Sequence, residues 1–246
     1  MTIYRTSEVA AVIGVHPNTV RLYEEWGLIP AAERQPNGYR VFTTFHIQQF
    51  FLARTAFQIE VLQGGLRKKI VDVVKLSAKS DFTKAILLTQ EYIADVRTER
   101  SHADEAIHIV QNILTGETSD TPILMKRKEV SDHLGISMDT LRNWEMNGLL
   151  NVKRRQNGYR VYTEQDIKHL KIIRSLRCAN YSLEAILRML QQLSQNPDVD
   201  IKLALNTPRQ DDDIISVCDK LITSLTSAER NALKILDMLQ KMKEQF

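Results

Sequence analysis

Cysteine is scarce in this sequence: two residues, Cys178 and Cys218, stand 40 positions apart and outside any CxxC spacing. This pattern indicates neither a disulfide framework nor a thiolate metal site. No apolar run approaches the roughly 18 residues that a membrane helix needs, and the N-terminal stretch MTIYRTSEVA lacks the apolar core of a signal peptide. These absences predict a cytoplasmic protein with no membrane segment.

Catalytic motifs are missing as well. The sequence contains no phosphate-binding glycine motif, no HExxH pair and no nucleophile elbow. The six histidines are scattered, and His102 and His108 do not have the i, i+4 spacing of a helical metal pair. We therefore predict that the protein is not an enzyme, needs no cofactor and holds no metal.

The formal net charge of +3 conceals an alternation along the chain. Residues 1–70 hold eight Lys and Arg against five Asp and Glu, a net charge of +3. Residues 122–193 hold thirteen against seven, a net charge of +6, so the remaining segments sum to −6. Basic blocks that coincide with compact domains favour nucleic-acid binding over a general solubility surface.

An internal repeat is present as well. The stretch NGYRVF at 37–42 returns as NGYRVY at 157–162, and EVAAVIGVHPNTVRLYEEWGLIP from Glu8 aligns with EVSDHLGISMDTLRNWEMNGLLN from Glu129. The offset is 121 in the first stretch and 120 after one residue is lost. Duplication on this scale predicts two structurally similar domains.

Each copy predicts a helix, a turn and a second helix. The first helix spans 7–13 or 128–134 and ends at Gly14 or Gly135, where a left-handed conformation is easy for glycine. The second helix starts after Ser137 in one copy and after His16 with Pro17 in the other. A short turn between two such helices is typical of a helix-turn-helix.

A β-wing follows each helix-turn-helix. Asn-Gly predicts a two-residue type I′ hairpin turn, after which GYRVF or GYRVY forms the returning strand. Thr163 with Asp166 is a capping box for a helix over 164–178, and Thr43 begins a similar helix over 44–57. The predicted fold is mostly α, with two winged helix-turn-helix domains.

Two acidic segments carry heptad seams with 4-3 spacing. The first seam contains Phe82, Ile86, Thr89, Ile93, Val96, Arg100, Ala103, Ile107, Val110 and Leu114, and the second contains Ile214, Cys218, Leu221, Leu225, Ala228, Ala232, Ile235, Leu239, Met242 and Phe246. Each segment predicts a helix of about 33 residues, or roughly 50 Å. The alternative is that each helix packs on its own domain. The expected domains are 1–76, 77–121, 122–195 and 196–246, with the second and fourth holding the long helices.

The stretches TVRLYEEWGLI…NGYRVF and TLRNWEMNGLL…NGYRVYTEQDIKHLKIIRSLRCANYSLEAI resemble the DNA-binding domain of the MerR family of bacterial transcription regulators. The resemblance implies that Arg21 and Arg142 contact DNA from the recognition helices, near the aromatic residues Tyr23 and Trp144. It implies wing contacts from Tyr39, Arg40, Tyr159 and Arg160. The chain departs from the family at Leu22 and Asn143, where an aromatic residue is usual.

Further DNA-binding candidates come from the start of each recognition helix and from the basic stretch before the second wing. They are His16, Asn18, Thr19, Ser137, Asp139, Thr140 and Arg154. Contacts of this kind with phosphates supply affinity and register more than sequence discrimination.

Proteins of the resembled family are usually homodimers joined by one antiparallel coiled coil, and here one chain carries both halves. The linker TGETSDTPIL spans at most about 35 Å, which suits a helix that ends beside the second domain. We expect a monomeric pseudo-dimer, with a homodimer as the alternative. The expected partners are double-stranded promoter DNA, RNA polymerase and a small-molecule effector, for which the loop at 194–210 is one candidate site. The expected function is a transcription regulator that activates by distorting the DNA between promoter elements in response to a small molecule. The alternatives are a ligand-sequestering resistance protein and a ligand-free architectural or repressing protein.

Overall fold

The computed structural model describes residues 2–58, 65–114, 124–150, 152, 160–178, 181–184, 186–187 and 214–246. The chain divides into two compact units, one formed by Met1–Arg97 with Ser224–Phe246 and the other by Thr98–Thr223. Each unit contains one copy of the sequence repeat. The predicted effector loop at 194–210 lies outside the described residues.

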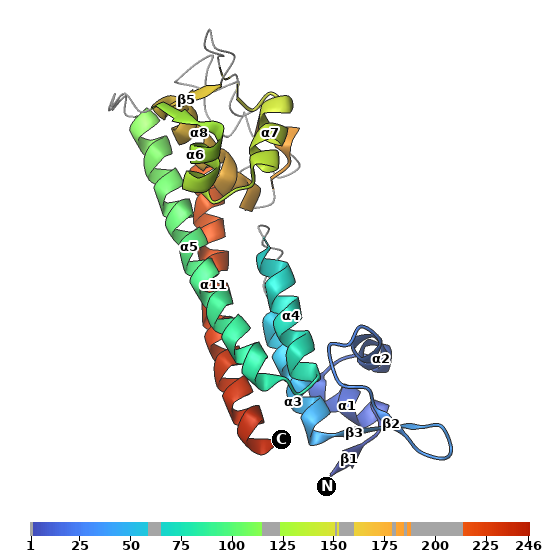
Figure 1. Ribbon diagram of the computed structural model, residues 1–246. Coiled ribbons are helices and arrows are strands. Elements are labelled where there is room, and N and C mark those ends of the chain that lie inside the picture. The colour runs from blue at the N-terminus through green and yellow to red at the C-terminus, as the bar shows by residue number, and fades with distance from the viewer. Residues whose placement is uncertain are drawn as a thin grey trace. The chain divides into compact units, whose positions relative to one another are not determined.

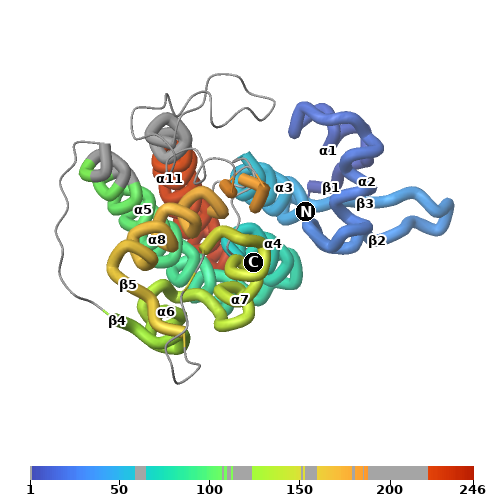
Figure 2. Tube along the Cα trace, turned by 90° about the horizontal axis from the view of Figure 1, so that it is seen from above, coloured from blue at the N-terminus to red at the C-terminus, as the bar shows by residue number. Residues whose placement is uncertain are grey.

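The first unit begins with a small domain of helices and short strands (Figure 1). Its elements are β1 (Ile3–Tyr4), α1 (Thr6–Ile13), α2 (Pro17–Glu25), β2 (Glu33–Arg34), β3 (Arg40–Thr43), α3 (Thr44–Ala56) and α4 (Leu66–Ala78). The strands form an antiparallel sheet in the order β1-β3-β2, with Tyr4 opposite Phe42 and Arg34 opposite Arg40. The β2–β3 hairpin extends away from α1 and α2 (Figure 2).

Apolar residues from the helices and β3 fill one core in this domain. The cluster consists of Val9, Ala10, Ile13, Val20, Ile29, Phe42, Ile47 and Phe50. Val9 and Ile13 are four residues apart and therefore face the same side of α1. Their burial against α2 and α3 leaves the opposite side of the helix-turn-helix in solvent.

The second unit repeats this arrangement. It contains β4 (Leu124–Lys126), α6 (Arg127–Leu134), α7 (Met138–Met146), β5 (Val161–Thr163) and α8 (Glu164–Cys178). Leu124 pairs with Thr163 as Ile3 pairs with Thr43, which is the register that the sequence repeat requires. The internal duplication is thus a duplication of structure.

Most of the predicted helices are confirmed within one or two residues, including the left-handed conformations of Gly14 at φ 73° and Gly135 at φ 60°. The capping box is also confirmed, because Asp166 accepts a hydrogen bond from the Thr163 N–H at 2.8 Å. Strands β1 and β4 were not predicted. They are two and three residues long, too short for an alternating pattern to reveal.

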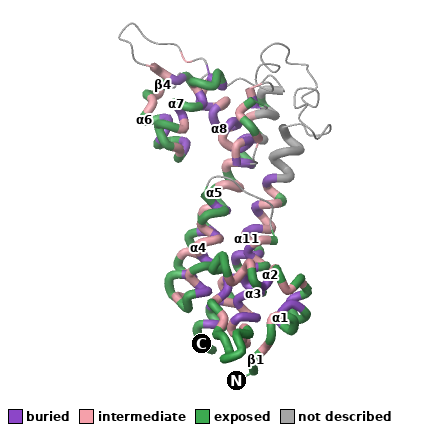
Figure 3. The backbone as a smooth tube through the Cα atoms, turned by 90° about the vertical axis from the view of Figure 1, so that its right-hand side faces the viewer, coloured by how far each residue is buried: buried purple, intermediate pink, exposed green. Residues whose placement is uncertain are grey.

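Two long helices, α5 (Phe82–Leu114) and α11 (Ile214–Gln245), correspond to the predicted heptad segments. Buried residues line both helices (purple in Figure 3). On α11 the predicted seam positions that are buried are Leu221, Leu225, Ala228, Ala232, Ile235, Leu239 and Met242, whereas Phe246 is 48% exposed. On α5, Phe82, Thr89, Ile93, Val96 and Ala103 are buried, and Ile86 and Arg100 are half-buried.

Within the first unit, the beginning of α5 lies beside the end of α11 (Figure 1). The rings of Phe82 and Phe246 both contact Phe45 of α3, whereas Arg97 donates a 2.6 Å hydrogen bond to Glu229. Residue numbers therefore increase along α5 in the direction in which they decrease along α11, so the two segments are antiparallel. Outside the predicted seam, α5 also buries Ala85, Tyr92 and Ala106.

Candidate nucleic-acid interface

Each second helix of the two helix-turn-helix units starts at a side-chain cap. Ser137 Oγ accepts a hydrogen bond from the Thr140 N–H at 3.0 Å, as the sequence predicted. His16 Nδ1 accepts one from the Asn18 N–H at 3.1 Å. Because Nδ1 is the acceptor, the neutral His16 ring carries its proton on Nε2. The exposed ring can therefore donate to a phosphate without giving up the cap.

The predicted polar contacts gather on the outer face of these helices. Asn18 and Arg21 are exposed on α2, while Val20 between them is fully buried. Asp139 and Arg142 occupy the same positions on α7 and are also exposed. A three-residue spacing places both members of each pair on one face of the helix. Thr19 and Thr140 are half-buried beside these pairs.

Arg21 and Arg142 have neither a hydrogen-bond nor an ion-pair partner among the described residues. A guanidinium group carries five donors and is charged at any physiological pH. Both recognition helices therefore present an uncommitted cation to solvent.

The first wing is a hairpin with a different turn from the one predicted. The Gly38 N–H donates to the Gln35 carbonyl at 2.8 Å, and the Gln35 N–H donates to the Tyr39 carbonyl at 2.9 Å. Gly38 has a φ of 81°, whereas Asn37 does not have a positive φ. The two-residue type I′ prediction is therefore wrong for this wing, and the second Asn-Gly pair lies outside the described residues. Pro36 fixes its own φ near −65° and places the turn one residue earlier, so that the left-handed position falls on Gly38.

Arg40 ties the first wing to the recognition helix. Its Nε donates to Glu24 Oε2 at 2.6 Å, and the other Glu24 oxygen accepts from the Ala32 N–H at 3.1 Å. Glu24 lies on α2 and Arg40 on β3, so the ion pair fixes the strand against the helix. The predicted phosphate contact of Arg40 thus starts from an intramolecular pair, with the arginine side chain 27% exposed.

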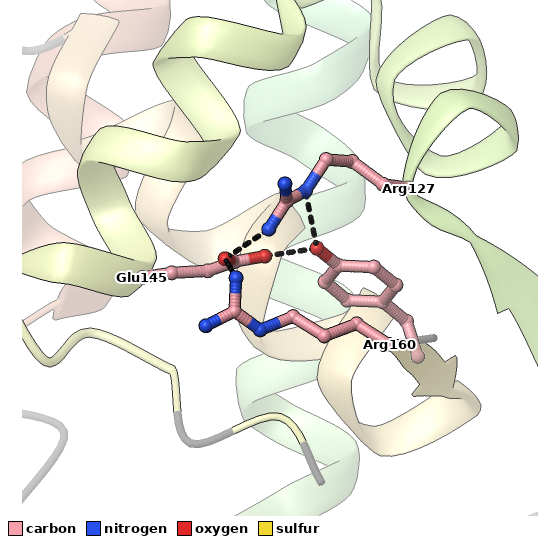
Figure 4. Close-up of polar contacts among 4 residues, drawn as sticks. Arg127, Glu145 and Arg160 are labelled. Atoms are coloured by element: carbon pink, nitrogen blue, oxygen red, sulfur yellow. Dashed lines mark hydrogen bonds and ion pairs between the residues drawn. The ribbon is translucent and has the colours of Figure 1, made fainter. Parts of the chain in front are cut away.

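The corresponding ion pair in the second unit is part of a cluster of four side chains (Figure 4). Glu145 of α7 accepts hydrogen bonds from Arg160 at 2.6 Å and from Arg127 at 2.5 Å, and the Tyr162 hydroxyl donates to its other oxygen. Arg127 Nε also lies 3.4 Å from the Tyr162 hydroxyl. The Glu145 side chain is 4% exposed, so the wing, the recognition helix and the start of α6 converge on one buried carboxylate.

The protonation of Tyr162 follows from this setting. Burial and the hydrogen bond to Glu145 raise the pKa of Tyr162 to about 12. The phenol therefore stays neutral and acts as a donor to the carboxylate near neutral pH. A buried carboxylate with three donors is well satisfied, which makes the cluster a rigid joint.

Family models match both halves of the chain. The model for a MerR HTH family regulatory protein matches residues 125–193, and the model for a MerR family regulatory protein matches residues 5–42. The HTH-type transcriptional regulator CueR of Salmonella typhi is 40% identical over 128 residues, which are 48% of this chain and 87% of that protein. The chain belongs to the MerR family.

Two further relatives match shorter stretches. CueR of Escherichia coli O6:H1 is 40% identical over 53 residues, 22% of this chain and 39% of that protein. The HTH-type transcriptional regulator AdhR of Bacillus subtilis is 39% identical over 64 residues, 26% of this chain and 46% of that protein. The chain therefore spans less than half the length of these two curated relatives. No solved structure matches significantly.

The aromatic residues expected from the MerR resemblance lie in the interior or at its edge. Trp144 is 5% exposed and packs in the core of the second unit, and its expected place near DNA stays a prediction. Tyr23 stacks on Phe50 with ring centroids 4.3 Å apart, and burial raises the pKa of Tyr23. In each recognition helix this position lies on the apolar face, because the helix must bury one face against its own domain.

Of the remaining predicted wing residues, Tyr39 is described by the structure and the other two are not. Tyr39 is 70% exposed at the tip of the first hairpin, so it is available to a partner. Arg154 and Tyr159 lie outside the described residues. Their roles as DNA contacts stay predictions.

Sequence reasoning missed the acidic members of the MerR-like wing joints. Glu24 and Glu145 form an identical pair in the repeat, but no role was assigned to them. An acidic residue in a basic, DNA-binding surface was the available signal. Arg127 and Tyr162 could not be found this way, because their equivalents in the first copy are Thr6 and Phe42.

In the described part of the chain, no helix is long and apolar enough to cross a membrane. Within the same residues, no three His, Cys, Asp or Glu side chains come together in a way that could hold a metal ion.

Proposed function

We propose that this protein is a DNA-binding transcription regulator whose two MerR-like halves bind one promoter site as a single-chain pseudo-dimer. The observation that carries the proposal is the repeated helix-turn-helix with an exposed, uncommitted arginine, Arg21 or Arg142, on each second helix. Arginine is the side chain that most often makes specific contacts with guanine, and it also binds phosphates.

The long helices support pairing within one chain. Thr55 of α3 and Ser175 of α8 are equivalent positions of the repeat. The Thr55 carbonyl accepts a hydrogen bond from Asn231 of α11, whereas Ser175 Oγ donates to the His102 carbonyl of α5. Equivalent positions of the repeat thus contact different long helices, which supports a pseudo-dimer. We propose that α5 and α11 form an antiparallel coiled coil that closes this pseudo-dimer.

The two halves do not present the same side chains to DNA. Asn18 beside Arg21 is replaced by Asp139 beside Arg142. Asparagine can bind adenine through two hydrogen bonds, whereas aspartate accepts from the cytosine amino group. The operator is therefore expected to be an imperfect palindrome. Asp139 also lies in the first turn of α7, where a carboxylate favours the helix dipole.

Activation by DNA distortion follows from fixing two recognition helices on one scaffold. Half-sites on relaxed DNA lie about 34 Å apart per helical turn. A different spacing in the protein would bend or untwist the duplex at a cost of about 1–6 kcal/mol. Such a change would bring separated promoter elements onto one face for RNA polymerase. An effector would act through its different affinities for the two states.

DNA selection from a random-sequence pool tests the proposal. We expect the wild-type protein to enrich a two-part site, and Arg21→Ala and Arg142→Ala to weaken binding to it, each at a different half. Lys241→Ala is the control, because Lys241 is exposed on α11 and pairs with Asp237 of the same helix. No enriched site, or unchanged affinity in both arginine variants, would contradict the proposal. Tight binding of a small molecule without DNA binding would support the sequestering alternative.

A further inference from the structure

A small cavity that is partly open to solvent lies in the second unit, where α5, α6 and α8 meet. Its volume is about 190 Å³, and it is lined by His102, Glu105, His133, Leu134, Lys171 and Arg174. An engineered cavity of about 150 Å³ in another protein holds benzene. The volume is therefore sufficient for a small organic molecule.

The cationic residues of the lining keep unused hydrogen-bond donors. Lys171 Nζ donates to Glu105 at 2.6 Å, and Arg174 Nη2 donates to Glu99 at 2.6 Å. Lysine has three donors and arginine has five, so each side chain can bind a second acceptor. Both side chains are partly open, at 23% and 14% exposure.

One residue of the lining is weakly held by its neighbours. The buried Nδ1 atom of His102 has no hydrogen bond among the described residues and forms a long ion pair with Glu99, at 3.7 Å. Because this atom is closed to solvent, His102 would meet a ligand through the rest of its ring.

The charge of the lining selects the class of ligand. Among the lining residues, the cations Lys171 and Arg174 face one carboxylate, Glu105; Glu99, the partner of Arg174, is not part of the lining. The carboxylate and imidazole groups do not converge as a metal site among the described residues. A negatively charged oxygen group satisfies these donors better than a cation or a neutral apolar molecule does.

The first half of the chain does not reproduce the site. Val12 and Phe51 occupy the positions of His133 and Lys171 in the repeat, and both are surface-exposed, at 50% and 43%. The polar cavity is thus a feature of the second half. A duplicated single chain can specialise one half in this way, which a homodimer of identical subunits cannot.

We propose that this cavity binds one small organic oxyanion per chain, a carboxylate or a phosphate ester, through Lys171, Arg174 and the two histidines. The anion would compete with Glu105 and Glu99 for their cationic partners. These ion pairs hold α8 against α5, so binding would change how the second helix-turn-helix is held. This consequence for DNA affinity, but not the binding itself, rests on the proposed function.

Titration calorimetry of the full chain with benzoate, phenyl phosphate and inorganic phosphate tests the site. We expect saturable binding of one organic anion per chain, with inorganic phosphate weaker because it leaves the rest of the cavity empty. Lys171→Met and His133→Val should each lower the affinity about tenfold or more, since a hydrogen bond to a charged group contributes that much. Phe51→Lys in the first half is the matched control and should change nothing.

Several results would overturn the proposal. They are the absence of saturable binding by either organic anion, equal binding of inorganic phosphate, or affinities that Lys171→Met and His133→Val leave unchanged. Far-ultraviolet circular dichroism confirms that both variants fold. DNA binding is measured separately on the same samples. If the protein binds the anion but no DNA, the proposed function alone is contradicted. If the DNA affinity is the same with and without the bound anion, the regulatory consequence is overturned.

Discussion

Glu145 shows how one side chain can organise a domain. Its carboxylate receives hydrogen bonds from Arg127, Arg160 and Tyr162, whereas Glu24 in the first half receives one side-chain donor, Arg40. The side chains of Glu145 and Glu24 are 4% and 13% exposed. The second wing is therefore held to its recognition helix by more side-chain hydrogen bonds than the first, although the two wing sequences are nearly the same.

Tyr162→Phe tests the contribution of the phenol to this joint. The change removes one hydrogen bond to a buried carboxylate, so we expect the free energy of unfolding of the second domain to fall by about 1.5–3 kcal/mol. Urea unfolding in a Trp26→Phe background isolates the fluorescence of Trp144, which is buried in that domain. Tyr39→Phe is the control, because that residue is 70% exposed. Equal losses in both variants would refute the assignment.

The pH dependence of the same variant follows from the raised pKa. Burial and Glu145 raise the pKa of Tyr162 to about 12, from an ordinary value near 10. The folded state holds this proton more tightly, so the contribution of Tyr162 to stability is complete below about pH 10 and is lost as the pH rises toward 12. The stability difference between wild type and Tyr162→Phe should therefore shrink over that range. A constant difference would show that the pKa of Tyr162 is not raised in the folded protein.

Arg40 and Arg160 can each serve the joint and a phosphate. We expect Arg40→Ala and Arg160→Ala to weaken binding to all DNA sequences and to lower the salt dependence by about one phosphate contact. Arg40→Lys keeps the charge and should keep the salt slope. Fluorescence anisotropy at several salt concentrations measures both quantities. Unchanged slopes in the two alanine variants would limit these arginines to holding the wings.

At the scale of elements, local signals predicted most of the helices well. Glycine at a helix end, serine at a helix start and the Thr163–Asp166 capping box each act within four residues, so they can be read directly from the sequence. The same holds for the α11 seam, where period and burial agree from Leu221 to Met242. The helix-turn-helix and its exposed arginines were therefore predictable.

The misses have physical causes. Pro36 displaced the turn, and its effect competes with the Asn-Gly signal that favoured type I′. The cavity in the second unit is lined by residues from three helices, so no residue spacing within a single helix could predict it.

Gly135 tests the importance of the first helix end. Its φ is 60°, and a Cβ atom added to it would meet nothing within 4 Å. Gly135→Ala should thus cost only the backbone strain of the left-handed conformation, about 1–2 kcal/mol. Gly135→Asn should cost less, since asparagine visits that region more readily. Unfolding followed by Trp144 in the Trp26→Phe background measures both. Equal stability of wild type and Gly135→Ala would mean that the helix ends elsewhere.

At the scale of the whole molecule, the duplication changes what each half can become. Subunits of a homodimer share every substitution, whereas the halves of this chain differ at Asn18 and Asp139, at Phe42 and Tyr162, and at Phe51 and Lys171. These differences fall on the recognition helix, the wing joint and the cavity. Under the proposed function, one chain would therefore read two different half-sites and carry an asymmetric ligand site.

Native mass spectrometry of the protein with its selected DNA site tests the single-chain pseudo-dimer most directly. The free protein should have the mass of one chain, 28.3 kDa, and the complex should contain one chain and one duplex. The variant with both Arg21→Ala and Arg142→Ala should keep the free mass and lose the complex. A free species of twice the chain mass, or two chains on one duplex, would contradict the account, because the long helices would then pair between chains.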